Sequence, residues 1–439
     1  MTTRREFLNT AAATAAGLAV ATTAKSYGQI LGSNDRLNFA VIGLNSRAYA
    51  HLSSLKANKK NARIAYVCDV ESNILKKFAA STTKEMGEAP ATEKDFRHIL
   101  ARKDVDAITI ATPDHWHAPM AIAGLQAGKH VYVEKPCSHN PGEGAMLVAA
   151  QQKYGKLVQM GTQQRSSPHT IEIVDKIHNG LVGRAYMAKS WYSNTRKSIG
   201  VGKPAPVPAE LDWDLWQGPA PRTAYRDNVQ PYNWHWFKVW GTGETLNNGT
   251  HEVDVARWAL GVDTPKEISS SGGRYAFKDD WQFYDTLVSN FKYDDKIISW
   301  ECKCCNGSRV FNRDRGTVIV GETGSVLIDR DGYEVYDLKG IKTSEFKTGK
   351  ETSSSDLTGR DSMTDLHFAN FIAGVQKGTK LNAPVSVGNV AVTMLQLANV
   401  AWEVDRVLHI DPTTAKVQND AQAMKFWDRD YEKGWAPHL

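Results

Sequence analysis

The stretch Phe39-Ala40-Val41-Ile42-Gly43-Leu44-Asn45-Ser46-Arg47-Ala48 runs from an apolar strand candidate into a turn and the start of a predicted helix. A dinucleotide-binding fold places its phosphate-binding turn at such a helix N-terminus. Compared with the pattern G-x-G-x-x-G/A, Gly43 and Ala48 fit and Asn45 does not. Asn tolerates left-handed backbone geometry better than most residues, but its side chain would crowd a pyrophosphate. Taken alone, the stretch also suits an ordinary strand, turn and helix.

Apolar runs and helix-like segments continue to alternate beyond this unit. The runs lack polar alternation, which is typical of parallel strands buried on both faces, and lie at 37–43, 64–69, 107–113 and 131–134. Helices are predicted near 47–58, 71–81, 93–102, 117–127 and 141–154. The series predicts a doubly wound parallel sheet, which we assign to residues 36–160.

The second strand candidate ends at Val67-Cys68-Asp69. An acid at this point of a βαβ unit accepts hydrogen bonds from ribose hydroxyls, and it repels a 2′-phosphate. Asp69 therefore favours NAD over NADP. A solvated carboxylate at a strand end is the simpler alternative.

After Leu157 the pattern changes. One more short strand is predicted through Gly161, then a helix near 168–178, and a Pro- and Trp-rich loop region spans 193–240. Strands are predicted at 186–192, 267–275, 286–293, 296–304, 317–321 and 325–336, and a closing helix at 385–407. Because no helices separate the later strands, we expect them to pair antiparallel. Residues 161–439 are thus predicted to form a second α/β domain with a large, mainly antiparallel open sheet.

Two motifs follow buried strands, where ligands bind in such sheets. The first is Thr112-Pro113-Asp114-His115-Trp116-His117, and the second is Glu134-Lys135-Pro136, preceded by Ala127-Gly128-Lys129-His130-Val131. The order T-P-x-x-x-H, A-G-K-H-V and E-K-P resembles the Gfo/Idh/MocA oxidoreductases, over nearly the whole mature chain. The resemblance implies a Rossmann domain and an NAD-dependent enzyme that acts on CH–OH groups of carbohydrates.

In that family the E-K-P lysine lies beside the nicotinamide and the reacting carbinol, so Lys135 is the predicted central catalytic residue. A lysine partly desolvated near a cationic nicotinamide should lose its proton more easily and can act in acid-base transfer. Pro136 would fix the turn that aims it. The predicted cofactor-binding residues are Gly43, Asn45, Ser46, Arg47, Asp69, Thr112, Pro113, His117, Glu134 and Lys135.

A later segment, 241–254, resembles the family pattern G-G-x-x-x-D-x-G-x-H-x-x-D. His251 matches the catalytic histidine, whose side chain is suited to exchange a proton with a hydroxyl. Asn247 falls where many members have Asp. An amide can position a sugar hydroxyl but cannot take its proton, so Lys135 and His251 must carry more of the proton transfer.

Between these motifs, 213–219 and 232–237 resemble a branch of the family with aromatic segments. Aromatic faces stack on the C–H faces of sugars, although packing of the loop onto the sheet explains such residues equally well. The candidate substrate residues are Gln163, Arg165, Trp234, His235 and Trp236. His115 and His117 could hold a metal, but the family needs none, and we predict none.

The N-terminus, Thr3-Arg4-Arg5-Glu6-Phe7-Leu8 followed by an uncharged run over 11–24, resembles a twin-arginine signal. The run is too short to span a bilayer. We assign residues 1–35 to signal and linker and expect a periplasmic or otherwise exported protein with no membrane span. An ordinary helix that begins with Arg-Arg is the alternative.

Composition excludes little else. The formal charge of +5 over 439 residues is small, so a nucleic-acid partner gains no support. The five cysteines, Cys68, Cys137, Cys302, Cys304 and Cys305, match no common metal or disulfide spacing. Strand packing explains them, although Cys302 and Cys304 would share one strand face and could bind a metal or pair oxidatively.

Three function classes remain open. The first is hydride transfer between a sugar or glycoside carbinol and a bound, recycled NAD. The second is NAD-dependent glycoside hydrolysis through transient oxidation and elimination; the family includes such hydrolases, and the E-K-P lysine argues for the first class. The third is a non-catalytic NAD- or sugar-binding protein. The family's open sheet also leads us to expect a homo-oligomer, either a dimer or a tetramer.

Overall fold

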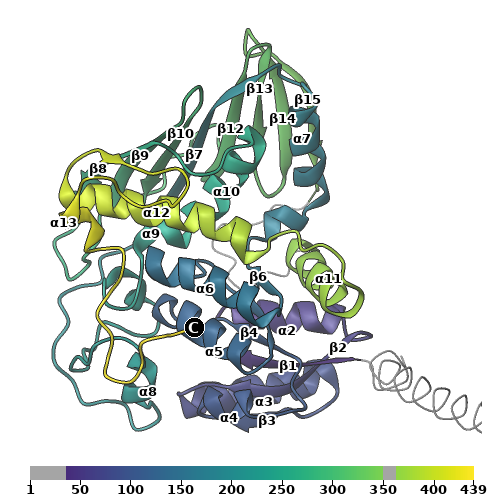
Figure 1. The fold of residues 1–439 in the computed structure, drawn as a ribbon, viewed down its shortest axis with the longest axis vertical. Helices are drawn as coiled ribbons and strands as arrows, with labels where there is room; N and C mark the ends of the chain where they lie inside the picture. The colour runs from purple at the N-terminus through teal and green to yellow at the C-terminus, as the bar shows by residue number, and fades with distance from the viewer. Residues whose placement is uncertain (1–35, 350–361) are drawn as a thin grey trace, which may run out of the picture.

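The computed structural model describes residues 36–349 and 362–439, so the predicted signal lies outside the described residues. Its first sheet is entirely parallel, with the strand order β3-β2-β1-β4-β5-β6 (Figure 1). The strands are β1 (Leu37–Ile42), β2 (Ala62–Cys68), β3 (Ala91–Glu93), β4 (Ala107–Ile110), β5 (His130–Val133) and β6 (Val158–Met160). The order reverses between β1 and β4, where doubly wound sheets bind ligands. The predicted parallel sheet is confirmed.

Helices flank this sheet, and their ends follow local chemistry. They are α2 (Ala48–Ala57), α3 (Ser72–Met86), α4 (Phe96–Leu100), α5 (His117–Gln126) and α6 (Pro141–Tyr154). The Glu71 carboxylate accepts the N–H groups of Asn73 and Ile74 and so caps α3. Helix α6 is capped by Asn140 and starts at Pro141, and Gly155, whose backbone lies in the left-handed region, follows its last residue.

The second sheet has the order β15-β14-β13-β12-β7-β10-β9-β8-β16. Its strands are β7 (Ala185–Thr195), β8 (Glu267–Gly273), β9 (Thr286–Lys292), β10 (Ile297–Lys303), β12 (Arg315–Gly321), β13 (Gly324–Ile328), β14 (Gly332–Asp337), β15 (Lys342–Lys347) and β16 (Leu408–His409), and β11 (Cys305–Asn306) pairs with β7 outside this order. The large, mainly antiparallel open sheet is confirmed. Strands β7 and β10 pair parallel, because a long connection rather than a hairpin joins them.

The prediction of a single strand over 325–336 is wrong. The structure has two strands there, β13 and β14, which form an antiparallel hairpin. The Asp329 carboxylate accepts the N–H groups of Asp331 and Gly332, at 2.8 and 2.9 Å, and so forms the turn. The apolar run conceals this turn because both strands are largely buried.

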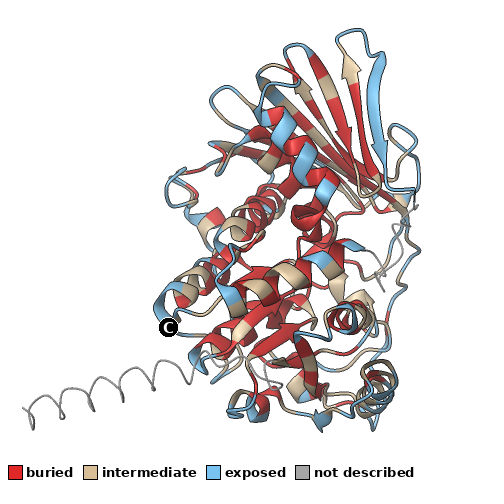
Figure 2. Ribbon diagram, turned by 90° about the vertical axis from the view of Figure 1, so that its right-hand side faces the viewer, coloured by how far each residue is buried: buried red, intermediate tan, exposed pale blue. Residues whose placement is uncertain are grey.

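Helices on one face of the large sheet connect it to the parallel sheet. They are α7 (Pro168–His178), α10 (Gly249–Leu260) and α12 (Val385–Val404). Buried residues run along both sheets, whereas the edge strand β15 is exposed (Figure 2). Among the described residues, α12 is the one helix long and apolar enough to cross a bilayer, and 67% of that window is buried inside the protein.

A helix absent from the sequence predictions, α11 (Ser362–Lys377), completes the core of the parallel sheet. Its Phe368, Phe371 and Ile372 belong to the same buried cluster as Phe39 of β1. Phe368 stacks on Tyr132 of β5, with ring centroids 4.2 Å apart. Packing therefore crosses the predicted boundary between 36–160 and 161–439.

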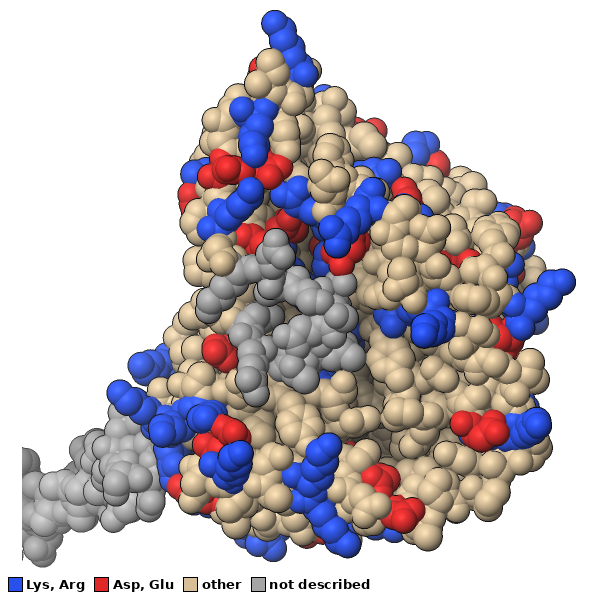
Figure 3. Space-filling view, turned by 180° about the vertical axis from the view of Figure 1, so that it is seen from behind, with Lys and Arg blue, Asp and Glu red and all other residues tan. Residues whose placement is uncertain are grey.

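The surface carries mixed charge. On the face in Figure 3, Lys and Arg lie scattered among Asp and Glu rather than in one stripe. All five cysteines are free; Cys302 and Cys304 are fully buried, and burial raises the pKa of the Cys304 thiol well above its usual value.

The loop region after β7 also reaches the parallel sheet. Its segment 210–218, here called the strap, includes α8 (Trp213–Gln217) and pairs with the loop after β2: Ser72 N–H donates to Glu210 O at 3.0 Å and Asp212 N–H to Val70 O at 3.1 Å. The C-terminal residues 427–439, here called the tail, run beside it (Figure 1). Trp435 of the tail meets Trp116 edge-on at 5.2 Å.

The strap ends at Gly218, where we expect a larger residue to be strongly destabilising. Its φ is +46°, and a Cβ atom would lie 1.8 Å from Cζ2 of Trp116. Gly218→Ala should lower the free energy of unfolding by about 2 to 4 kcal/mol, because it adds overpacking to backbone strain. Gly155→Ala is the matched control: its φ is +65° but it has open space, so it should cost about 1 kcal/mol. Equal losses in denaturant titrations would contradict the close contact with Trp116.

Candidate active site

The turn after β1 approaches the end of β4 closely. Gly43 has φ +79°, and a Cβ there would lie 2.7 Å from the backbone N of Thr112. The left-handed residue further along is Ser46, with φ +44°, rather than Asn45. The Asn45 Oδ1 atom accepts the Ser46 N–H at 2.9 Å, so this side chain shapes the turn. In place of the second glycine stands an Asn whose side chain accepts the backbone N–H of the next residue.

Asp69 is tied to the same turn. Its carboxylate accepts the N–H of Leu44 at 2.7 Å and that of Glu71 at 2.9 Å. Burial raises the pKa of Asp69 to about 6, although these N–H groups oppose the shift. The acid expected to receive ribose hydroxyls therefore lies at the turn, with an ionisation close to neutral pH.

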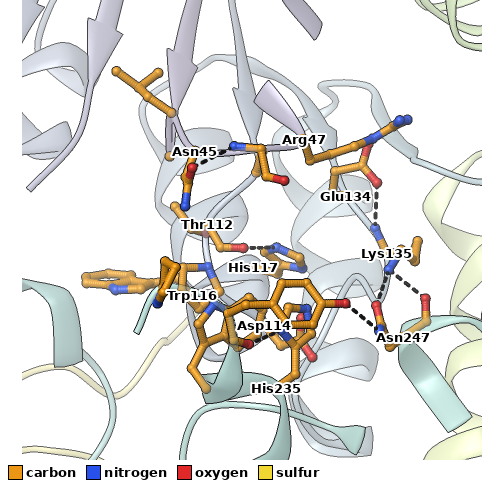
Figure 4. Close-up of a pocket in the computed structure, with 18 of the residues that line it drawn as sticks. Asn45, Arg47, Thr112, Asp114, Trp116, His117, Glu134, Lys135, His235 and Asn247 are labelled. Carbon is orange, nitrogen blue, oxygen red and sulfur yellow. Dashed lines mark hydrogen bonds and ion pairs between the residues drawn. The ribbon is translucent and has the colours of Figure 1, made fainter. Parts of the chain in front are cut away.

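A cavity of about 680 Å³ extends from this turn along the carboxyl edge of the parallel sheet to α10. All ten predicted cofactor-binding residues line it, as do His251 and Asn247. Asn45 and Arg47 lie at one end and His235 and Asn247 at the other (Figure 4). Residues of the two sheets thus meet around one cavity.

Two of the five candidate substrate residues do not line the cavity. Gln163, Trp234 and His235 line it. Buried Arg165 instead donates to both oxygens of Asp254, at 2.6 and 2.9 Å, because a buried guanidinium requires a partner. Trp236 is buried and stacks on Trp281, with ring centroids 3.9 Å apart.

Lys135 lies where the two halves of the cavity meet. Its Nζ donates to the backbone O of Asn247 at 2.7 Å and to its Oδ1 at 3.1 Å (Figure 4). Burial lowers the pKa of Lys135, and the carboxylates of Asp114, Glu134 and Glu244 oppose this shift. An ammonium with three donors keeps one for a ligand after these two bonds.

His251 stands in the first turn of α10 and faces the same cavity. Burial and the positive charges of Arg330, Lys135 and Arg315 lower its pKa well below the usual value. The ring is therefore neutral near pH 7 and can accept a proton or a hydrogen bond.

Glu134 connects the turn to Lys135. Its buried carboxylate accepts hydrogen bonds from Arg47 Nε at 2.8 Å and Gln163 Nε2 at 3.3 Å, and it lies 3.0 Å from His51 Nε2. Burial alone would raise its pKa, but Arg47 and His51 hold it well below the usual range. Glu134 thus acts as an anionic anchor next to Lys135 in sequence.

His117 joins the two motif segments. Its Nδ1 lies 2.6 Å from Pro136 O and its Nε2 2.8 Å from Thr112 O. Both partners are acceptors, so both contacts are hydrogen bonds only when the ring carries two N–H groups. His115 turns away, toward Trp216 O at 3.1 Å. Among the described residues, no group of three or more His, Cys, Asp or Glu is placed to hold a metal.

Sequence reasoning missed Gln164. It is 4% exposed and lines the cavity, and neither amide atom has a hydrogen-bond partner among the described residues. Thr112 Oγ1 is likewise buried without a described partner. Buried polar atoms are almost always hydrogen-bonded, so these atoms fit a ligand with hydroxyl or amide groups, as a dinucleotide and a sugar have. Only burial could identify Gln164, because no motif marks it.

Aromatic rings gather beside the catalytic candidates. Trp234 stacks on His235 with centroids 3.6 Å apart, and Tyr232 lies 4.2 Å from His235 on ring centroids. Other Trp residues pack the loop region: Trp213 stacks on Trp216 at 4.8 Å. Packing of the loop therefore explains Trp213 and Trp216, and stacking of Trp234 on a sugar stays a prediction.

Similar proteins include both dehydrogenases and glycosyl hydrolases. An inositol 2-dehydrogenase from Rubrobacter xylanophilus is 28% identical over 299 residues, 68% of this chain and 72% of that protein. A glycosyl hydrolase family 109 protein from Saccharopolyspora erythraea is 29% identical over 215 residues, 45% of this chain and 47% of that protein. The chain thus spans about half the length of the glycosyl hydrolase relatives it matches.

Solved structures share the fold. A levoglucosan dehydrogenase in complex with NADH and levoglucosan superposes with a TM-score of 0.67 at 17% identity. The match covers 86% of this chain and 100% of that one. At this identity the likeness establishes the arrangement of the two sheets.

The ionisation of Asp69 should control dinucleotide binding. Ribose hydroxyls donate to the carboxylate, so the affinity of cofactor-free protein for NAD should rise as the pH rises through about 6. Asp69→Asn should remove this pH dependence and narrow the preference for NAD over NADP. Calorimetric titrations of both dinucleotides between pH 5 and pH 8 measure this. An unchanged pH dependence in the variant would refute the role of Asp69.

Gln164→Leu should separate function from stability. The variant removes a buried amide without a described partner, so the free energy of unfolding should stay constant or rise by up to about 1 kcal/mol, while kcat/KM falls about tenfold. Gln163→Leu is the matched control and should lose stability, because Gln163 donates to Tyr132 and Glu134. A destabilised Gln164→Leu with normal kinetics would contradict a ligand-facing role.

Two protein-family models match along the chain. Residues 37–162 match an oxidoreductase family with an NAD-binding Rossmann fold, and residues 172–327 match the GFO/IDH/MocA C-terminal domain. These matches coincide with the parallel sheet and with much of the large mixed sheet. The cofactor of the first sheet is therefore NAD, and the chain belongs to the Gfo/Idh/MocA oxidoreductase family.

Proposed function

We propose that this protein oxidises or reduces a carbinol of a sugar or glycoside with a nicotinamide that stays bound between turnovers. The observation that carries the proposal is the position of Lys135, buried where the cofactor-binding turn, Asn247 and His251 share one cavity. NAD, when bound, supplies the hydride acceptor, and NADH the donor. The chain supplies the site and moves the hydroxyl proton.

Lys135 and His251 divide the proton chemistry. Burial favours the neutral amine of Lys135, which takes the hydroxyl proton as the C–H bond is oxidised and returns it in reduction. Neutral His251 accepts a hydrogen bond from the same region of the substrate. Asn247 holds Lys135 in place through its two oxygens.

A polyhydroxylated ring suits the far half of the cavity, the half near His235 and Asn247. Trp234 and Tyr232 offer aromatic faces there, and Asn248 and Arg196 offer hydrogen-bond donors. Gln164 adds an amide with no described partner. Aromatic faces beside several donors are typical of carbohydrate sites.

The strap supports retention of the cofactor. Leu211, Leu215 and Trp216 line the cavity, as do Phe96 and Met120. Lys94 also holds Asp212 at 2.8 Å. Release of a dinucleotide would require these contacts to open. Retention suits export by the predicted twin-arginine route, because no free NAD pool is expected in the periplasm, and it would let one sugar be oxidised while another is reduced.

Glycoside hydrolysis is the second candidate, favoured by the family 109 relatives. Transient oxidation two carbons away from the anomeric carbon would acidify the C–H between them, and the aglycone would leave the anomeric carbon by elimination. Water would then add, and the same NADH would restore the alcohol. The residues that move the hydroxyl proton would be the same. The two candidates differ in their products.

The test combines cofactor identity with product analysis. The purified protein is denatured, the released nucleotide is identified by mass spectrometry, and sugars and glycosides are screened for reduction of the bound NAD at 340 nm. Lys135→Ala should keep the nucleotide and lose about 100-fold or more in turnover, because general acid-base catalysis contributes this much. Exposed Lys153→Ala is the control. Released aglycone without net NADH would establish hydrolysis. A Lys135→Ala variant as active as wild type would refute the catalytic role of Lys135, and a wild type without turnover on any sugar or glycoside would favour a binding protein.

A further inference from the structure

The orientation of the Asn247 amide decides whether an oxygen or an NH₂ group faces the Lys135 ammonium. Its Oδ1 faces Lys135 Nζ at 3.1 Å (Figure 4), and its Nδ2 faces Tyr232 OH at 3.3 Å and Glu244 Oε1 at 3.4 Å. A tyrosine hydroxyl can donate or accept, whereas a carboxylate only accepts. Glu244 is therefore the partner that requires Nδ2 on its side and oxygen on the side of Lys135.

Glu244 also organises the residues around the far half of the cavity. It is fully buried in α9 (Gly243–Asn247) and does not itself line the cavity. Its Oε2 accepts Arg196 Nε at 2.7 Å, and its Oε1 also accepts Asn248 Nδ2. Arg196, Asn247 and Asn248 all line the cavity, so one carboxylate holds three of the cavity's side chains.

The charge of Glu244 reaches Lys135 as well. Burial lowers the pKa of Lys135, and Glu244 is one of three carboxylates that oppose the shift, with Asp114 and Glu134. The nearby positive charge of Arg47 lowers the pKa of Lys135 further. The charge of Lys135 in turn lowers the pKa values of His235 and His251. The balance among these groups sets how readily Lys135 releases its proton.

We propose that Glu244 is a positioning residue that supplies, through Asn247, the carboxylate that residue 247 itself lacks. Glu244 keeps the amide oxygen of Asn247 oriented toward Lys135, and it contributes a negative charge one helical turn before residue 247. It also holds the side chains of Arg196 and Asn248 toward the substrate. This inference rests on the proposed function of Lys135. It explains how an amide can replace an acid beside the catalytic lysine.

Glu244→Gln is the test, because it keeps shape and removes charge. The new Nε2 would face the Nδ2 atoms of Asn247 and Asn248, so these amides should turn and Lys135 should lose its Oδ1 acceptor. We expect kcat to fall by up to about 100-fold, as for a misplaced catalytic group. The limb of the pH profile that reports Lys135 should move to lower pH, because a charge that favours the ammonium is gone.

A second measurement does not need turnover. Competitive acetylation of the holoprotein with acetic anhydride, read by mass spectrometry of the Lys135 peptide, follows the neutral amine as a function of pH. In Glu244→Gln the reaction of Lys135 should begin at lower pH than in wild type. Adding Asn247→Asp should restore the wild-type onset or raise it, because it places a carboxylate directly at Lys135.

Asp254→Asn is the matched control. It also removes a buried carboxylate paired with an arginine, Arg165, which lies outside the cavity. It should lower the melting temperature and leave the pH profile of Lys135 acetylation unchanged.

Identical Lys135 profiles in wild type and Glu244→Gln, with activity lost in proportion to the folded fraction, would overturn the proposal. A shifted profile in a protein that oxidises no carbinol would instead refute the proposed function and leave the position of Glu244 intact.

Discussion

The burial of one amine, Lys135, is the constraint on which the rest of the site depends. A buried ammonium requires acceptors and opposite charge, and here they come from both halves of the molecule. Asn247 contributes two oxygens from α9, and Glu134 contributes a carboxylate from the end of β5. The two sheets must keep a fixed relation for these groups to meet, so the position of Lys135 and the packing of the domains are coupled.

On each side of the cavity, a buried carboxylate paired with an arginine fixes the local geometry. Glu134 binds Arg47 of the cofactor turn, and Glu244 binds Arg196 of the substrate side. In both pairs the arginine lines the cavity; Glu134 lines it as well, whereas Glu244 does not. Removing one member would leave a buried charge without compensation, which costs more than the pair contributes. Such pairs therefore give a definite geometry rather than simple stability, and definite geometry is what hydride transfer requires.

The strap and the tail, both from the second half of the chain, pack beside the part of the cavity predicted to hold the cofactor. The strap pairs with the loop after β2 and lines the cavity next to Asp69, while the tail packs on Trp116 beneath it. The second half of the chain thus encloses a site that a Rossmann domain alone would leave open to solvent. An enzyme that reuses one nicotinamide has no need of a fast exit for it, which suits the proposed function.

The sequence by itself determined the two sheets, the cofactor turn and the residues at the strand ends. These features follow from local rules: apolar runs without alternation mark buried parallel strands, and the carboxyl ends of such strands share one edge. Asp69 could be identified because it ends a buried strand, whereas Lys135 and His251 could be identified because their motifs resemble those of the Gfo/Idh/MocA family. NAD could be predicted in preference to NADP because Asp69 follows the second strand.

Only the tertiary structure decided which polar side chains face each other. The sequence around Arg165 could not show that its side chain binds Asp254. Likewise, nothing in the sequence near Gln164 shows that its amide is buried without a described partner. The hairpin at Asp329 was hidden because both of its strands are largely buried and read as one apolar run. Glu244 became visible only through its contacts with Asn247 and Arg196. Burial and hydrogen-bond partners depend on contacts between distant segments, and a pattern along one segment carries no record of them.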